Sequence, residues 1–226
     1  MDSPKNTGRI IGLLIAFHMV GSGLVNFILE KPIFGDGFLL SAAPNSRQIA
    51  GAVILGILTE ALWTAIAITA FPIFFALSRR MTLWIVALAV VGLTLAVVEN
   101  IGVLSMVSLS QAFEKAAIAE QEQLRVAGVI VTSARDWPHF ISRMFSGVIA
   151  LVFFLVLFRF SMVPKPLSLL GLIAGVSMVI AVTMPLFGQS VIFAMLAPMG
   201  IAQLSLAAWL LVKGLRIPDL IETEAK

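Results

Sequence analysis

The sequence contains no cysteine, and only 12% of its 226 residues are charged. The lack of cysteine excludes disulfide bonds, thiolate metal sites and cysteine nucleophiles. An ordinary soluble domain carries about 25% charged and roughly 45–50% apolar residues; here 60% of the residues are hydrophobic. A water-soluble fold of this size cannot bury so much apolar surface behind so few charges. The composition therefore predicts an integral membrane protein.

The common sequence motifs of enzymes are also missing. The chain has no HExxH motif, no glycine-rich phosphate loop and no G-x-S-x-G elbow. Its only histidines, His18 and His139, fall at depths that differ by roughly 15 Å when counted along helices, so they cannot ligate one haem iron. We expect no metal site and no cofactor, and we favour a protein that is not an enzyme.

Six long apolar runs dominate what is present. Each can cross roughly 30 Å of hydrocarbon as a helix, and none shows the alternation that a barrel strand needs. We predict an all-α polytopic membrane protein, a bundle of six transmembrane helices in a single membrane domain, 1–226. The expected spans are 10–29, 49–77, 81–107, 138–158, 167–187 and 191–212, with outer loops at 30–48 and 108–137.

The distribution of lysine and arginine predicts the orientation, with both termini in the cytoplasm. Nine basic residues fall on the inner side and five on the outer side of this arrangement. The inner set is Lys5, Arg9, Arg79, Arg80, Arg159, Lys165, Lys213, Arg216 and Lys226, and the outer set is Lys31, Arg47, Lys115, Arg125 and Arg135.

The second outer loop has the pattern of an amphipathic helix. Phe113, Ala117, Ile118 and Leu124 fall on one helical face, and charged residues surround them. Such a helix extends the third span or lies on the bilayer surface. A solvated lid without a further role explains the pattern equally simply.

Polar side chains fall at matched depths in four spans. Glu60 and Glu99 each lie 19 residues from the basic turn at 79–80, so an antiparallel hairpin places both carboxylates at one level. Asn26 and Arg143 lie at a similar depth in their own spans. Ionisable residues inside a membrane are costly, and they mark functional sites by default. We predict that Arg143 reaches at least one of the two carboxylates.

The predicted ligand site is an outward-facing polar pocket around these residues. Glu60, Glu99 and Arg143 would form it, and Arg143 would supply a positive charge for an anionic group. Asn26 and Asn100 would be hydrogen-bonding neighbours. The sixth candidate is Trp63, one turn from Glu60, which would wall the pocket.

Three further polar residues are secondary candidates. His18 and Gln203 both fall near the midplane, where one hydrogen bond between them would satisfy each. His139 falls at the outer surface.

Three short motifs stand out along the chain. They are PMGIAQLSLAAWLLVKG at 198–214, RIIGL at 9–13, and VPK at 163–165 followed by LGLIAG at 170–175. In this order they resemble the closing signature, the opening, and the inner turn with the fifth span of a bacterial family of multi-pass membrane proteins, domain-of-unknown-function family 4386. The family commonly has Glu where this chain has Gln203. The resemblance implies a multi-pass fold in the bacterial cytoplasmic (inner) membrane and assigns no activity.

Three hypotheses for function remain open. The first is that the protein binds, or helps to transport, a small molecule or lipid through the outward-facing pocket. The second is an intramembrane enzyme that uses Glu60 or Glu99 as general acid or base on a lipophilic substrate. The third is a structural or regulatory subunit whose polar layer only orders the bundle. We expect a lipid bilayer as the environment and no nucleic-acid partner.

Overall fold

The computed structural model describes residues 3–34 and 37–216. Lys226, one of the basic residues used to predict orientation, lies outside these ranges. Within them the chain forms helices and no strand. Six helices of this described part are long and apolar enough to cross a membrane, which confirms the predicted fold class. They are α1 (Pro4–Leu24), α3 (Ser46–Leu77), α4 (Arg79–Lys115), α5 (Ile118–Arg159), α6 (Lys165–Thr183) and α7 (Ala197–Lys213).

Short helical elements join or extend the long helices. The last turn of α1 widens into the π-helix η1 (Val25–Leu29), which a 3₁₀ turn, η2 (Lys31–Ile33), follows after Glu30. The helix α2 (Phe38–Ser41) belongs to the first outer loop. Between α6 and α7 lie two 3₁₀ turns, η3 (Met184–Phe187) and η4 (Phe193–Met195).

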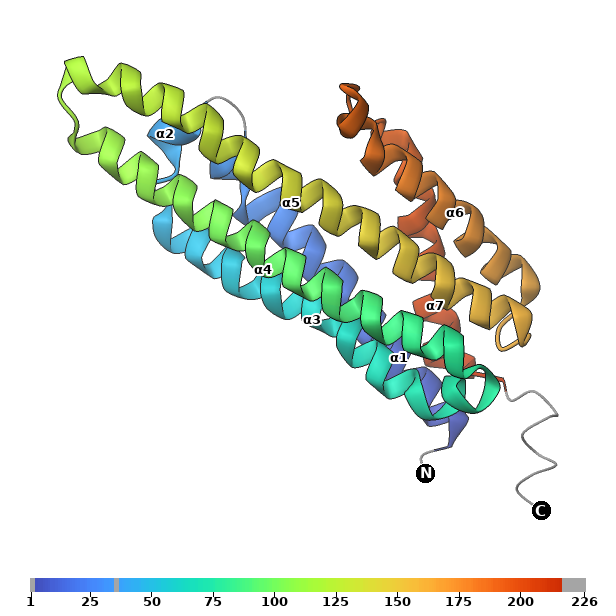
Figure 1. Ribbon diagram of the computed structural model, residues 1–226. Helices are drawn as coiled ribbons and strands as arrows, with labels where there is room; N and C mark the ends of the chain where they lie inside the picture. The colour runs from blue at the N-terminus through green and yellow to red at the C-terminus, as the bar shows by residue number, and fades with distance from the viewer. Residues whose placement is uncertain (1–2, 35–36, 217–226) are drawn as a thin grey trace.

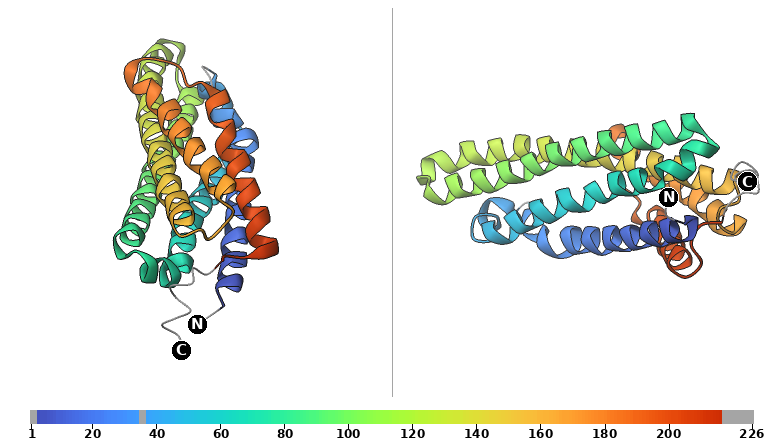
Figure 2. Two further views of the ribbon diagram at one scale, coloured as in Figure 1. Left: turned by 90° about the vertical axis from the view of Figure 1, so that its right-hand side faces the viewer. Right: turned by 90° about the horizontal axis from the view of Figure 1, so that it is seen from below.

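The helices pack in a closed ring. Each long helix contacts its neighbour in sequence, and α7 returns to pack against α1. Figure 1 shows α1, α3, α4 and α5 running side by side, with α6 and α7 beside α5 and α1. The start of α1 and the end of α7 lie at the same end of the bundle in Figures 1 and 2, as an even number of spans requires. We call the opposite end distal. That the distal end faces outward remains a prediction.

The second outer loop follows the expectation in part. The third span does extend as a helix, since α4 continues to Lys115, but α5 begins at Ile118 and takes the rest of the loop. The expected face is therefore divided between two helices, with Phe113 on α4 and Leu124 on α5. At 1.5 Å per residue α4 and α5 are about 55 and 63 Å long, so they extend well beyond the roughly 30 Å of a hydrocarbon core. Their distal ends form the hairpin at the upper left of Figure 1.

Two apolar clusters are buried at different heights in the bundle. The basal core lies toward the termini, and its largest buried side chains include Ile11, Ile15, Trp63, Ile66, Phe74, Phe153 and Phe154. The distal core packs the first outer loop against α3 and α4, through residues such as Phe38, Leu39, Ile49, Val103, Met106 and Phe113. On α1, α3 and α4, the segments between the two cores carry the polar residues. The site is thus enclosed by apolar packing at both ends.

Candidate functional site

Polar side chains recur every four residues along α1 and along α5, so each helix presents them on one face. On the first helix they are Ser22 in α1, Asn26 in η1 and Glu30 directly after η1. In η1 the backbone N–H of Glu30 donates to the carbonyl of Val25 at 2.9 Å, five residues earlier. Such π-turns occur frequently at functional sites.

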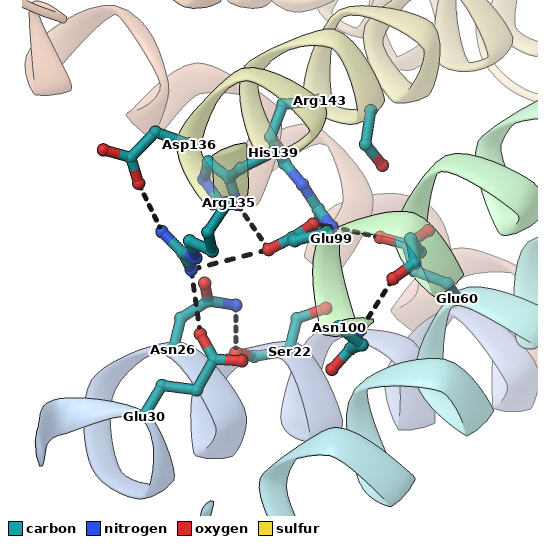
Figure 3. A network of polar contacts seen from close by, with 12 residues as sticks. Ser22, Asn26, Glu30, Glu60, Glu99, Asn100, Arg135, Asp136, His139 and Arg143 are labelled. Atoms are coloured by element: carbon teal, nitrogen blue, oxygen red, sulfur yellow. Dashed lines mark hydrogen bonds and ion pairs between the residues drawn. The ribbon is translucent and has the colours of Figure 1, made fainter. Parts of the chain in front are cut away.

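The expected ion pair between α3 and α5 is present. Arg143 Nη2 lies 2.5 Å from Glu60 Oε1 and 4.0 Å from Glu99 Oε2 (Figure 3). Glu60 and Glu99 are both almost fully buried. The prediction that Arg143 reaches at least one of these carboxylates is therefore confirmed.

A second arginine was not among the predicted site residues. Arg135, expected in the outer loop, is buried on α5 and donates from Nη2 to Glu30 Oε2 at 3.0 Å and to Glu99 Oε1 at 3.5 Å. Its Nη1 donates to Asp136 at 3.2 Å, and its guanidinium lies over the ring of Phe34. Arg135 and Glu30 thus form a pair at the distal side of the cluster.

His139 joins the same network instead of lying apart at the surface. Its Nδ1 lies 2.7 Å from Glu99 Oε1. Arg135, His139 and Arg143 recur at four-residue spacing on α5, and all three contact Glu99 (Figure 3). Glu99 is therefore the shared acceptor that joins the two arginines. We call Glu30, Glu60, Glu99, Arg135, His139 and Arg143 the ionic cluster.

Two asparagines flank the ionic cluster and are anchored to their own helices. Asn26 Nδ2 donates to the carbonyl of Ser22 at 2.9 Å, and Asn100 Nδ2 donates to that of Ala96 at 2.8 Å. These bonds fix the orientation of both side-chain amides. The buried Oδ1 of Asn100 has no hydrogen-bond partner among the described residues, and it is free to accept one.

A small cavity lies between α1, α3, α4 and α5. Its free volume is about 20 Å³, which is room for about one water molecule. Most of its lining is polar: Ser22, Asn26, Glu30, Thr59, Glu60, Glu99, Asn100 and Arg143, with Val25, Gly56 and Ala96. The side chains of His139 and Arg143 are each 21% exposed, so the cluster is accessible from the side of α5.

Two sequence-based assignments need correction. Trp63 does not line the cavity; it is buried in the basal core, edge-on to His18 and Phe153. The expected hydrogen bond between His18 and Gln203 is absent, because both ring nitrogens of His18 lack a partner among the described residues. Similar depth along two helices did not place these two side chains face to face.

Formal charges in the cluster are unequal. Three buried carboxylates face two buried guanidiniums, and Asp136 adds a partly exposed fourth carboxylate beside Arg135. Burial raises the pKa of Glu30 above its usual value, and the attraction of Arg135 opposes this. Within the described residues, no group of three or more His, Asp or Glu side chains is arranged to hold a metal ion.

Comparison with known proteins identifies a family but no characterised relative. No curated protein and no solved structure matches the chain. The sequence model of a family described as "Domain of unknown function (DUF4386)" matches residues 10–214. This match covers all six membrane-spanning helices of the described structure. The chain belongs to the DUF4386 family.

Proposed function

We propose that this integral membrane protein binds a small polar molecule or ion inside its helical bundle, at the cavity beside the ionic cluster. One observation carries the proposal: residues that line the cavity hold buried polar atoms without a hydrogen-bond partner among the described residues. These atoms are Oδ1 of Asn100 and Nε of Arg143. Arg135 Nε, in the adjoining ionic cluster, also lacks a partner.

Unpaired buried polar atoms are unfavourable, so their concentration needs a cause. In folded proteins most buried polar groups have a hydrogen-bond partner. Each buried polar group that lacks a partner lowers the stability of the fold by about 1–3 kcal/mol. A bundle that used this layer only to fix helix register would have no reason to retain them. A small polar ligand in the cavity could accept from Arg143 and donate to Asn100.

The size of the cavity limits the guest. Room for about one water molecule suits an ion or a very small molecule, and it does not suit a lipid. The two arginines are already paired with carboxylates, so Arg143 does not supply the free positive charge that we had expected for an anionic ligand.

The proposal requires water to reach the cavity, and single cysteines can test this. The native chain has no cysteine, so any introduced thiol is the only one. Ala96→Cys places it in the cavity lining. We expect silver ion, a thiol reagent small enough to follow water, to label this variant when it is added to intact cells, since thiolates form readily only in water.

A matched control lies on the same helix. Ala89 is also a buried alanine of α4, two turns nearer the termini, but it belongs to the basal core. Ala89→Cys should remain unlabelled. If Ala96→Cys is as unreactive as Ala89→Cys from both sides of the membrane, the cavity is dry and the proposal is wrong.

A further inference from the structure

The unequal numbers of positive and negative groups in the ionic cluster indicate the charge of the ligand. Arg143 is matched by Glu60 and Arg135 by Glu30. Glu99 is the third buried carboxylate; it shares these arginines, and its other partner is His139, which carries a charge only when protonated. A buried charge without compensation is costly. While His139 is neutral, one additional positive charge would balance the cluster.

The cavity also offers the oxygen atoms that a small cation prefers. Glu30, Glu60 and Glu99 line it, and carboxylate, amide and hydroxyl oxygens are the usual ligands of hard cations. Asn100 adds an independent indication: its amide nitrogen is held by Ala96, while its Oδ1 is buried, lines the cavity and has no partner among the described residues.

We propose that the cavity binds a water-sized monovalent cation, such as sodium, potassium or ammonium, whose charge compensates Glu99. This inference rests on the proposed function and names the class of its ligand. The cavity volume excludes large organic cations. A divalent ion would exceed the single positive charge that the cluster lacks.

Gly56 permits a test that preserves the ionic cluster. A Cβ atom built there would lie 3.6 Å from Asn100 Oδ1 and 3.8 Å from Val25 Cγ1, at ordinary van der Waals distances. Gly56→Ala therefore fits without displacing a neighbour, and its methyl group would occupy the cavity. Alanine also favours the helix. The matched control is Gly51→Ala on the same helix, where a Cβ would meet nothing within 4 Å.

The experiment measures the thermal unfolding of the purified full-length protein in detergent. Chloride salts of sodium, potassium and ammonium are compared with choline chloride at one ionic strength. For the native chain and Gly51→Ala, at least one small cation should raise the midpoint, by on the order of 3 °C at ten times its dissociation constant.

Gly56→Ala should lose this cation-dependent rise while keeping a midpoint in choline at least as high as that of Gly51→Ala. The inference is overturned if no small cation differs from choline in the native chain, or if the rise persists undiminished in Gly56→Ala. The proposed function would survive either result if Ala96→Cys is labelled, because an aqueous cavity can hold a neutral guest.

Discussion

The basal core and the ionic cluster are built from the same helices but meet opposite requirements. In the basal core, Phe153 lies against Trp63, Phe74 and Phe154, and close contact alone satisfies these side chains. In the ionic cluster each charged group needs a specific partner at short distance. The comparison teaches that the two regions should fail differently. Loss of apolar volume should lower the stability in proportion to the cavity that is left. Loss of one charged group should leave its partner buried without a counter-charge.

The largest effect should follow from removing one member of a buried pair. Arg143→Gln leaves Glu60 buried without its guanidinium. Breaking such a pair costs about 3–5 kcal/mol, and we expect a loss of this size in an SDS unfolding titration of the purified protein.

The double variant sharpens this test. Glu60→Gln combined with Arg143→Gln removes both charges and keeps amides that can hydrogen-bond, so it should recover most of the lost stability. If the double variant is as unstable as the sum of the two single ones, the pair is not coupled and the comparison fails.

A somewhat smaller loss should follow from truncation in the basal core. Phe153 is fully buried, and Phe153→Ala should lower the free energy of unfolding by about 2–4 kcal/mol. This loss is smaller than the roughly 3–5 kcal/mol of a Phe→Ala substitution in a soluble protein, because here the unfolded chain also stays in an apolar phase. Phe193→Ala, at a side chain that is 79% exposed, is the control and should change little in the same titration.

The pH dependence of stability should report Glu30. Burial raises the pKa of Glu30 in the folded chain. Its stabilising contribution is therefore complete below its unfolded pKa and is lost as the pH rises through the folded value. Glu30→Gln should flatten this decline of the unfolding midpoint. A decline as steep as that of the native chain would show that another group is responsible.

The smallest effect is expected at the surface. Arg125 and Glu122 are 4.0 Å apart on the distal part of α5, with side chains 58% and 82% exposed. Exposed pairs of this kind contribute about 0–1 kcal/mol. Arg125→Gln should therefore leave the unfolding titration within about 0.5 kcal/mol of the native one. A loss as large as that of Arg143→Gln would contradict the distinction between buried and exposed pairs.

The fold was predictable because membrane spans depend on length and apolarity, and both can be counted along the sequence. The ends of α4 and α5 were not. Apolar runs mark the part of a helix that lies in hydrocarbon, but a helix can continue in water where its residues favour it. Gln, Glu, Ala and Leu of 111–125 are good helix formers. As a result, the expected loop at 108–137 is almost entirely helical.

The site was predicted only in part, because depth is readable from the sequence and direction is not. Equal depth correctly paired Glu60 with Arg143, but it wrongly paired His18 with Gln203. Glu30 and Arg135 were missed because charged residues were taken as boundaries of spans. The four-residue spacing of Arg135, His139 and Arg143 was a usable signal once α5 was known to be continuous.

The π-turn of η1 makes the length of the first helix as important as its composition. It accommodates one residue more than an α-helical turn, and each residue of an α-helix accounts for about 100° of rotation. Deleting one residue from 26–29 would let a regular α-helix continue with the backbone N–H of Glu30 still opposite the carbonyl of Val25, so Glu30 would keep its place beside Arg135. One further residue inserted at the same place without a second π-turn would rotate the position of Glu30 by about 100°, away from Arg135. A family member without the extra residue should therefore keep its carboxylate in register, whereas one with a longer segment should carry the carboxylate at a neighbouring position.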